Sequence, residues 1–277
     1  MTKTGIGKLF VPNKNSHKGE NGRLLIIGGS KKYHGAPALS ILAARRFVDL
    51  VYFYPGEKDE NLIREVKKIP EVIVLRKLNE IDLEKIDCVL FGIGLGNAKI
   101  DITKLMTQDP KLKIMNPKLK TGNWKLVIDG DGLKRVKGKI PKGAILTPHE
   151  GEFKMLFSIP GTKENVKAMA KKHKCIILKK GQMDIISDGT KLKTNKTHNA
   201  GMTKGGTGDV LSGLVAALVC KNDSFKAAYA GALINGLAGE LLRKEVGFNF
   251  CASDLANRLN KAYRLVVNTG TTNSSRL

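Results

Sequence analysis

Short β-branched segments alternate with longer helical patterns along most of the chain, and this alternation limits the possible folds more than any other feature. Helix formers fill residues 36–50, for example, and Asp188-Gly189 marks a hairpin turn between residues 185–187 and 192–194. Alternation of this kind favours an α/β protein whose mostly parallel central sheet is covered by helices on both faces. The strands are expected at residues 23–27, 51–54, 72–75, 88–91, 125–128, 144–146 and 175–178.

Glycine and polar residues gather just after several of these expected strands, as in Gly28-Gly29-Ser30 and Asp129-Gly130-Asp131. In open α/β sheets, the carboxyl edge of the strands is where ligands bind. No linker, repeat or low-complexity tract divides the chain, so residues 1–267 are predicted to form one domain and 268–277 a flexible tail. Residues 111–123 are the least regular stretch and are interpreted as a surface excursion.

Composition and charge narrow the class of protein. No uncharged apolar run reaches membrane-spanning length and the N-terminus lacks a signal-like stretch, so we expect a cytoplasmic protein without a membrane partner. The formal charge of +23 attracts polyanions, but the lysines are dispersed and not interleaved with aromatic residues, so no dedicated nucleic-acid partner is predicted. A basic surface also steers phosphorylated small molecules. Four cysteines without CxxC spacing are interpreted as small buried hydrophobes: Cys88, Cys175, Cys220 and Cys251.

A glycine-rich junction, residues 199–209, runs directly into the apolar helical stretch 210–220. Successive backbone N–H groups of such a turn can point into one concavity, and the positive end of the following helix favours an anion there. Asp209 lies in the first helical turn, where the helix dipole is expected to lower its pKa and leave it ionised as a base. The alternative is an ordinary tight turn in which Asp209 only caps a helix.

Three segments occur in one order along the chain, residues 127–133, residues 146–153 and the Gly205-Gly206-Thr207-Gly208-Asp209 turn. Together they resemble the NAD(P)H-hydrate dehydratases of the ribokinase-like superfamily, and the resemblance extends from Lys18 to Leu255. It implies a three-layer α/β/α sandwich. It also implies a repair reaction in which hydrated NADH or NADPH is dehydrated at the expense of ADP or ATP, by phosphorylation of the hydroxyl and elimination of phosphate.

The resemblance assigns roles to individual residues. Asp209 would deprotonate the hydrate's hydroxyl while the N–H groups of Gly206, Thr207 and Gly208 stabilise charge on the transferring phosphoryl group. The nucleotide would bind against a segment that could otherwise be a plain strand-ending turn, together with Gly208: Lys180, Gly181, Gln182, Met183 and Asp184.

The hydrate is expected to bind, besides Asp209, four residues that follow strands: Ala36, Gly94, Gly96 and His149. Glycines there allow a backbone to approach a pyrophosphate closely, although residues 92–96 could equally be a strand-to-helix turn. His149 could donate or accept a hydrogen bond at ordinary pH, or be structural.

Mg²⁺ is the expected metal, because carboxylate oxygens are its preferred protein ligands. The candidates are Asp129, Asp131 and Glu152, each of which could instead cap a local helix. No cluster of histidines and cysteines suggests zinc.

Some positions depart from the family pattern. Gly130 and Gly132 stand where alanines are common, which predicts a looser segment, and Asn235 replaces a frequent histidine. Neither departure is expected to touch the chemistry. Only about twenty residues precede the first expected strand, so we expect a stand-alone form without the epimerase domain often fused to this one. The family often forms tetramers, so a homo-oligomer is predicted.

Two other classes stay open. A ribokinase-like kinase acting on a vitamin-precursor alcohol would use the same base and anion site but release its phosphorylated product. A non-catalytic protein that binds nucleotides or nucleic acid would accord with the charge alone.

Overall fold

A computed structural model describes residues 6–100, 102 and 124–268 of the chain. Its described strands form one nine-stranded sheet in the order β3-β2-β1-β4-β5-β6-β7-β8-β9. Neighbouring strands from β3 to β7 pair in parallel, and β8 and β9 are added antiparallel. The strands are β1 (Arg23–Gly28), β2 (Leu50–Pro55), β3 (Val72–Val74), β4 (Cys88–Phe91), β5 (Lys125–Ile128), β6 (Ile145–Leu146), β7 (Ile176–Lys179), β8 (Asp184–Ser187) and β9 (Leu192–Asn195).

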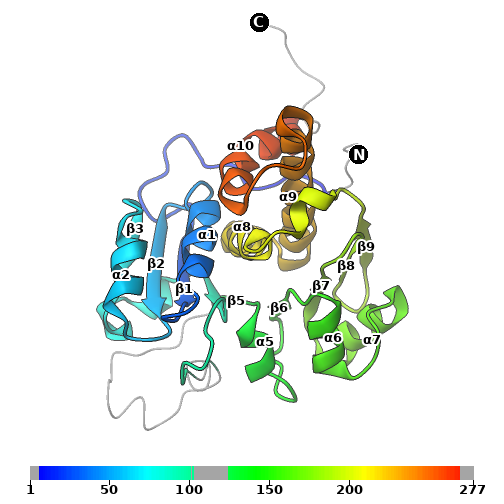
Figure 1. The fold of residues 1–277 in the computed structure, drawn as a ribbon, viewed down its shortest axis with the longest axis horizontal. Coiled ribbons are helices and arrows are strands. Elements are labelled where there is room, and N and C mark those ends of the chain that lie inside the picture. Colours follow the sequence, from blue (N-terminus) through cyan, green and yellow to red (C-terminus); the bar gives the residue numbers. More distant parts are fainter. Residues whose placement is uncertain (1–5, 101, 103–123, 269–277) are drawn as a thin grey trace, which may run out of the picture.

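Helices cover both faces of the sheet (Figure 1). One buried cluster joins the sheet to α1, α2, α8, α9 and α10, and a second joins it to α5, α6 and α7. The predicted three-layer α/β/α sandwich is therefore confirmed. The helices are α1 (Gly35–Ala44), α2 (Glu60–Lys67), α5 (Asp131–Arg135), α6 (Glu150–Phe157), α7 (Lys163–His173), α8 (Thr207–Lys221), α9 (Ser224–Val246) and α10 (Ala252–Asn268).

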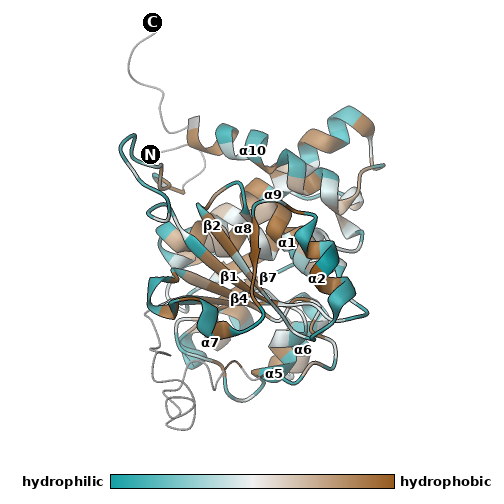
Figure 2. Ribbon diagram, turned by 90° about the vertical axis from the view of Figure 1, so that its left-hand side faces the viewer, coloured by the Kyte–Doolittle hydropathy of each residue, from teal (hydrophilic) through white to brown (hydrophobic). Residues whose placement is uncertain are grey.

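Strand β1 shows why the central strands are apolar on both sides. Leu24 and Ile26 belong to the first buried cluster, whereas Leu25 and Ile27 belong to the second. Successive side chains of a strand point to opposite faces, so a sheet covered on both faces needs an unbroken apolar run. Figure 2 shows these strands as a hydrophobic layer between helices with polar outer surfaces.

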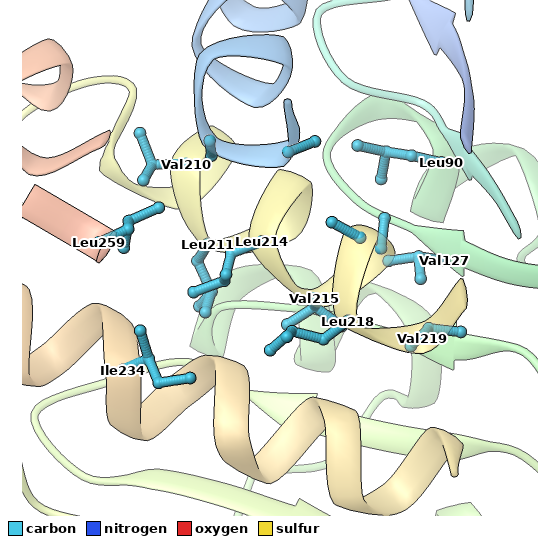
Figure 3. Close-up of a cluster of buried hydrophobic side chains, with 14 of the residues drawn as sticks. Leu90, Val127, Val210, Leu211, Leu214, Val215, Leu218, Val219, Ile234 and Leu259 are labelled. Atoms are coloured by element: carbon cyan, nitrogen blue, oxygen red, sulfur yellow. The ribbon is translucent and has the colours of Figure 1, made fainter. Parts of the chain in front are cut away.

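Helix α8 is buried along most of its length, from Val210 to Cys220. Figure 3 shows its side chains packed toward α9, α10 and the sheet. Two glycines allow close helix packing, since a Cβ at Gly213 would meet the backbone of Ser40 on α1, and one at Gly231 on α9 would meet Val215. The Ser40 hydroxyl also donates a hydrogen bond of 2.8 Å to the Asp209 carbonyl oxygen. The first turn of α8 is thus anchored to α1 and held in one position.

Several expectations about local structure need correction. Helix α1 ends at Ala44. Residues 45–49, which are expected to continue this helix, are not helical. Cys251 is exposed, although Cys88, Cys175 and Cys220 are buried as predicted. The hairpin of β8 and β9 is confirmed. The predicted excursion at residues 111–123 lies outside the described residues, as do residues 269–277 of the tail predicted at 268–277, whereas Asn268 belongs to α10. None of the described helices is long and apolar enough to cross a membrane.

Candidate active site

The loop before α8 is folded around its own polar groups. Gly206, the residue before the helix, has φ = +92°, and a Cβ there would collide with the Leu39 side chain. The Thr207 hydroxyl lies 2.8 Å from the Met202 carbonyl oxygen and 2.9 Å from that of Lys204, which closes the loop. The first N–H groups of a helix have no intrahelical acceptor. In the described structure, those of Gly208 and Asp209 have none outside the helix either. They are available to an anion, whereas the Thr207 N–H, one of the three donors expected from the sequence, lies 3.4 Å from the Lys204 carbonyl oxygen.

Asp209 lies in the first turn of α8 and is partly buried. Burial raises its pKa to about 7, and the negative charges of Asp129 and Glu152 act in the same direction against the attraction of Lys180. The prediction that the helix dipole lowers this pKa is therefore wrong, because burial and like charges outweigh the dipole. A carboxylate with a pKa near neutrality is a more effective general base than an ordinary one.

Lys180 connects three of these charges. It follows β7, and its ammonium donates a hydrogen bond of 2.7 Å to Asp129, which follows β5 and is 3% exposed. A Cβ added at Gly208 would lie 3.5 Å from the same nitrogen, so the ammonium also lies beside the start of α8. Burial acts to lower the pKa of Lys180, but Asp129, Glu152 and Asp209 raise it overall. Lys180 therefore stays a cation between the carboxylates and the anion site.

His149 and Glu152 form a reciprocal cap at the start of α6. The His149 Nδ1 accepts the N–H groups of Gly151 at 3.0 Å and Glu152 at 3.3 Å, and a Glu152 oxygen accepts the His149 N–H at 2.8 Å. An Nδ1 that accepts hydrogen bonds indicates a neutral ring with its proton on Nε2. The structural alternative for both side chains is thus realised, and the His149 Nε2 lies 3.6 Å from the Glu152 carboxylate. Burial raises the pKa of Glu152.

The three predicted metal ligands do not form one cluster. Asp131 accepts a 2.8 Å hydrogen bond from the Gly96 N–H and pairs with Lys134 at 2.9 Å. Asp129 and Glu152 instead interact electrostatically with each other and with Lys180, on which Asp209 also acts. Nowhere in the described part of the chain do three or more histidine, cysteine or acidic residues stand together as metal ligands would.

A cavity of about 330 Å³, which we call the α8 cavity, opens beside the anion site. Of the predicted nucleotide residues, Lys180, Gly181, Asp184 and Gly208 line it. Gln182 and Met183 do not; Met183 packs against the second buried cluster. His149 and Thr207, which the sequence analysis selected for other roles, also line the cavity. The remaining wall is formed by residues that the sequence analysis did not select: Thr197, His198, Met202, Thr203, Leu211, Ala232, Asn235 and Gly236.

A second cavity of about 980 Å³, which we call the basic cavity, lies at the same edge of the sheet. Gly96 lines it, and its cations are Lys31, Lys32, Lys134 and Arg135. Gly94 and Gly96 have φ of +58° and +53°. A Cβ at Gly94 would meet the Ala36 side chain, so Gly94 and Ala36, both predicted to bind the hydrate, lie side by side. The glycines here are required by the backbone as well as by any ligand.

The expectation of a looser segment at Gly130 and Gly132 is wrong. Gly130 has φ = +56°, and a Cβ at Gly132 would lie 2.7 Å from the Cα of Gly92, so this segment is closely packed and not loose. Asn235 lines the α8 cavity and is 5% exposed, and its Oδ1 has no hydrogen-bond partner within the described structure. It therefore lies in the wall of the α8 cavity, and that this departure does not touch the chemistry stays a prediction.

Comparison with known proteins agrees with this geometry. The family model for NAD(P)H-hydrate dehydratase matches residues 24–261, and the chain belongs to that family. It is 37% identical to the ADP-dependent (S)-NAD(P)H-hydrate dehydratase of Cenarchaeum symbiosum, over 91% of this chain and 92% of the relative. It is also 37% identical to the bifunctional NAD(P)H-hydrate repair enzyme Nnr of Methanocaldococcus jannaschii, over 91% of this chain. This chain spans only 50% of the length of that bifunctional relative.

The fold comparison agrees with the sequence comparison. The ADP/ATP-dependent NAD(P)H-hydrate dehydratase of Bacillus subtilis, co-crystallised with ATP and Mg²⁺, superposes with a TM-score of 0.77 at 25% identity. The match covers 94% of this chain and 95% of that one. The sandwich is thus the ribokinase-like α/β fold that the sequence predicts.

Proposed function

We propose that this chain dehydrates hydrated NADH or NADPH to the intact dinucleotide and hydrolyses ADP or ATP in doing so. The observation that carries the proposal is the position of Asp209, a carboxylate with a pKa of about 7, in the same helical turn as N–H groups that are free to bind phosphate. Family membership supports the choice of substrate.

The reaction begins with proton transfer to Asp209. As the carboxylate takes the proton of the hydrate's hydroxyl, that oxygen bonds to the terminal phosphorus of ADP or ATP, and the bond from that phosphorus to the bridging oxygen breaks. AMP or ADP leaves. Phosphate then departs from the ring carbon with the bonding electrons, and loss of a proton from the neighbouring carbon restores the double bond. Phosphorylation makes the hydroxyl oxygen a good leaving group.

Charge on the transferring phosphoryl group would be stabilised by the N–H groups at the start of α8 and by the Lys180 ammonium. Both are fixed before the substrate arrives, because α8 is anchored by packing and Lys180 by its 2.7 Å bond to Asp129. Preorganised donors of this kind need no rearrangement during the reaction. On this basis we propose Gly206 and Gly208 in their predicted roles together with the N–H of Asp209, and we propose that the N–H of Thr207 turns from the Lys204 carbonyl oxygen to the phosphate.

The α8 cavity would hold the nucleotide, and the hydrate would approach from the basic cavity past Ala36, Gly94, Gly96 and His149. The basic cavity supports this because its lysines attract a pyrophosphate. Mg²⁺ would bind mainly to the nucleotide's phosphates and neutralise their charge, and Asp129 and Glu152 would act on it through water. Asp131 is held elsewhere by Gly96 and Lys134.

A homo-oligomer in the cytoplasm, with residues 1–267 as one domain, completes the proposal. The family resemblance supports the assembly into a homo-oligomer. The continuous sheet that all described strands share supports a single domain.

Recovery of reduced-nicotinamide absorbance tests the function. The full chain is incubated with hydrated NADH or NADPH and Mg²⁺, separately with ADP, with ATP and without nucleotide. We expect recovery only with a nucleotide, and release of one phosphate per dinucleotide restored. Accumulation of a phosphorylated alcohol without recovery would contradict the proposal and favour a small-molecule kinase.

A further inference from the structure

Asn235 has hydrogen-bonding capacity that the protein does not use. It lies on α9 and is 5% exposed, and its Oδ1 is enclosed without a partner in the part of the chain that the structure describes. The residue nevertheless lines the α8 cavity, with Ala232 and Gly236 from the same face of the helix. A buried polar atom without a partner carries a desolvation cost, so its presence calls for an explanation.

The surroundings of Asn235 in the cavity wall are mainly apolar. Met202, Leu211 and Ala232 line the cavity, and Gly236 lets α9 pack against the Thr197 backbone, which a Cβ there would meet. The Asp184 carboxylate, which also lines the cavity, already accepts bonds of 3.1 Å from the Gly181 N–H and 3.0 Å from Asn195. The amide of Asn235 is thus an uncommitted polar group in a mainly apolar section of the wall.

The same cavity carries phosphate-binding groups. Lys180, Thr207 and Gly208 line it, beside the free N–H groups of α8. A nucleotide whose terminal phosphate lies at α8 therefore leaves its base to the remaining wall of the cavity, to which α9 contributes Asn235.

We propose that Asn235 recognises the adenine base and makes the site selective for adenine nucleotides. This inference rests on the proposed function, which assigns the cavity to ADP or ATP. An asparagine amide can pair with adenine through two hydrogen bonds, accepting from the 6-amino group and donating to N7. Rotation about the last side-chain bond exchanges the oxygen and the NH₂ group, so both are available to the base.

Inosine diphosphate is the matched competitor, because it differs from ADP at the position that Asn235 would read. Hypoxanthine carries an oxygen in place of the 6-amino group and would set it against the amide oxygen. A bidentate pair of this kind discriminates by about 10-fold or more between bases. The phosphates of the two nucleotides are identical, so the anion site contributes equally to both.

Calorimetric titration of the full chain with ADP and with inosine diphosphate tests the inference, using wild type, Asn235→Leu and Asn235→Ala. We expect wild type to prefer ADP by about 10-fold or more and both variants to bind the two nucleotides within about 2-fold of each other. Asn257→Leu is the control, because Asn257 is exposed on α10 and lines neither cavity. Two variants of different volume are used so that a packing defect in one leaves the other informative.

The steady-state rates should separate recognition from catalysis. In Asn235→Leu we expect the KM for ADP to rise by about 10-fold with kcat little changed, as for an interaction made equally in the ground and transition states. Unchanged preference for ADP in a folded variant would overturn the inference while leaving the proposed dehydratase intact. A wild type that prefers ADP through Asn235 but restores no dinucleotide would overturn the function and leave the base recognition standing.

Discussion

The two cavities at the carboxyl edge of the sheet hold their charges in different ways. At the α8 cavity, Lys180 and Asp129 are mostly buried and bonded to each other at 2.7 Å. At the basic cavity, Lys31 and Lys32 are exposed, and the cation of Lys134 is paired with Asp131 at the surface. Buried charges act strongly on their neighbours, whereas exposed ones are screened by water and salt. The first cavity is thus suited to chemistry and the second to attraction of an anionic substrate.

The largest effect is expected where the charges are buried. Asp209→Asn should lower kcat by about 100-fold to 10,000-fold, the range for loss of a general base. Affinity for ADP should change little, because the N–H groups of α8 stay in place. Absorbance recovery and calorimetry measure the two quantities. Asp59→Asn is the control, since Asn caps a helix as well as Asp does and Asp59 caps α2.

The stability of Asp209→Asn provides an independent check. The pKa of Asp209 is raised from 3.8 to about 7 in the folded state, so between these values the folded protein holds more protons than the unfolded chain. Stability conferred by this group is therefore lost as pH rises toward 7. We expect the variant to melt at a higher temperature than wild type at pH 8. A lower melting temperature there would indicate that the substitution damages the fold.

The next effect concerns pH. In wild type, kcat/KM should rise with pH through an apparent pKa of about 7, because Asp209 must be ionised to accept a proton. Lys180→Met removes the charge that lowers this pKa, so the midpoint should move upward and kcat should fall by about 100-fold or more. Lys221→Met breaks a similar 2.8 Å pair with Asp87 away from both proposed ligand sites and should leave the profile unchanged. An unshifted midpoint in Lys180→Met would contradict the charge cluster.

A third comparison uses neighbouring glycines of the anion site. Gly206→Ala introduces a Cβ at φ = +92° against Leu39 and should cost about 1–3 kcal/mol of stability. It should also weaken nucleotide binding by about 10-fold, the size expected for one lost hydrogen bond to a charged group. Gly205→Ala is the matched control, because a Cβ there has nothing within 4 Å. Thermal unfolding and calorimetry of both variants would reveal whether the cradle shape matters; equal behaviour would argue against it.

The smallest effect is expected in the basic cavity. Lys32→Ala removes one exposed cation and should raise the KM for the hydrate by about 2-fold to 5-fold at low salt, as for an exposed ion pair. The difference should disappear at high salt because the interaction is screened. Lys167→Ala on the exposed face of α7 is the control. A salt-independent effect would place Lys32 in direct, desolvated contact with the substrate.

Much of the fold could be predicted because local signals and tertiary structure agree. The β-branched runs that become strands are buried on both faces, and the Asp188-Gly189 turn joins β8 to β9 as expected. The end of α1 could not be predicted, since helix formers continue beyond Ala44. There the Asp49 carboxylate accepts the N–H groups of Gly19 and Asn21, so a distant segment fixes the chain.

The site was predicted where it depends on neighbours in sequence and missed where it depends on neighbours in space. The free N–H groups of Gly208 and Asp209 are a local feature of residues 199–209, the glycine-rich turn that the sequence selects. The raised pKa of Asp209 depends on Asp129 and Glu152, which are far away along the chain. Asn235 reaches the α8 cavity only because α9 packs against α8, and no pattern around it in the sequence indicates this.

A crystal structure with a slowly hydrolysed analogue of ADP or ATP would test the central claim most directly. The account predicts that the terminal phosphate accepts hydrogen bonds from the N–H groups at the start of α8, with the Asp209 carboxylate facing its open side. A terminal phosphate bound at the basic cavity, remote from Asp209, would contradict it.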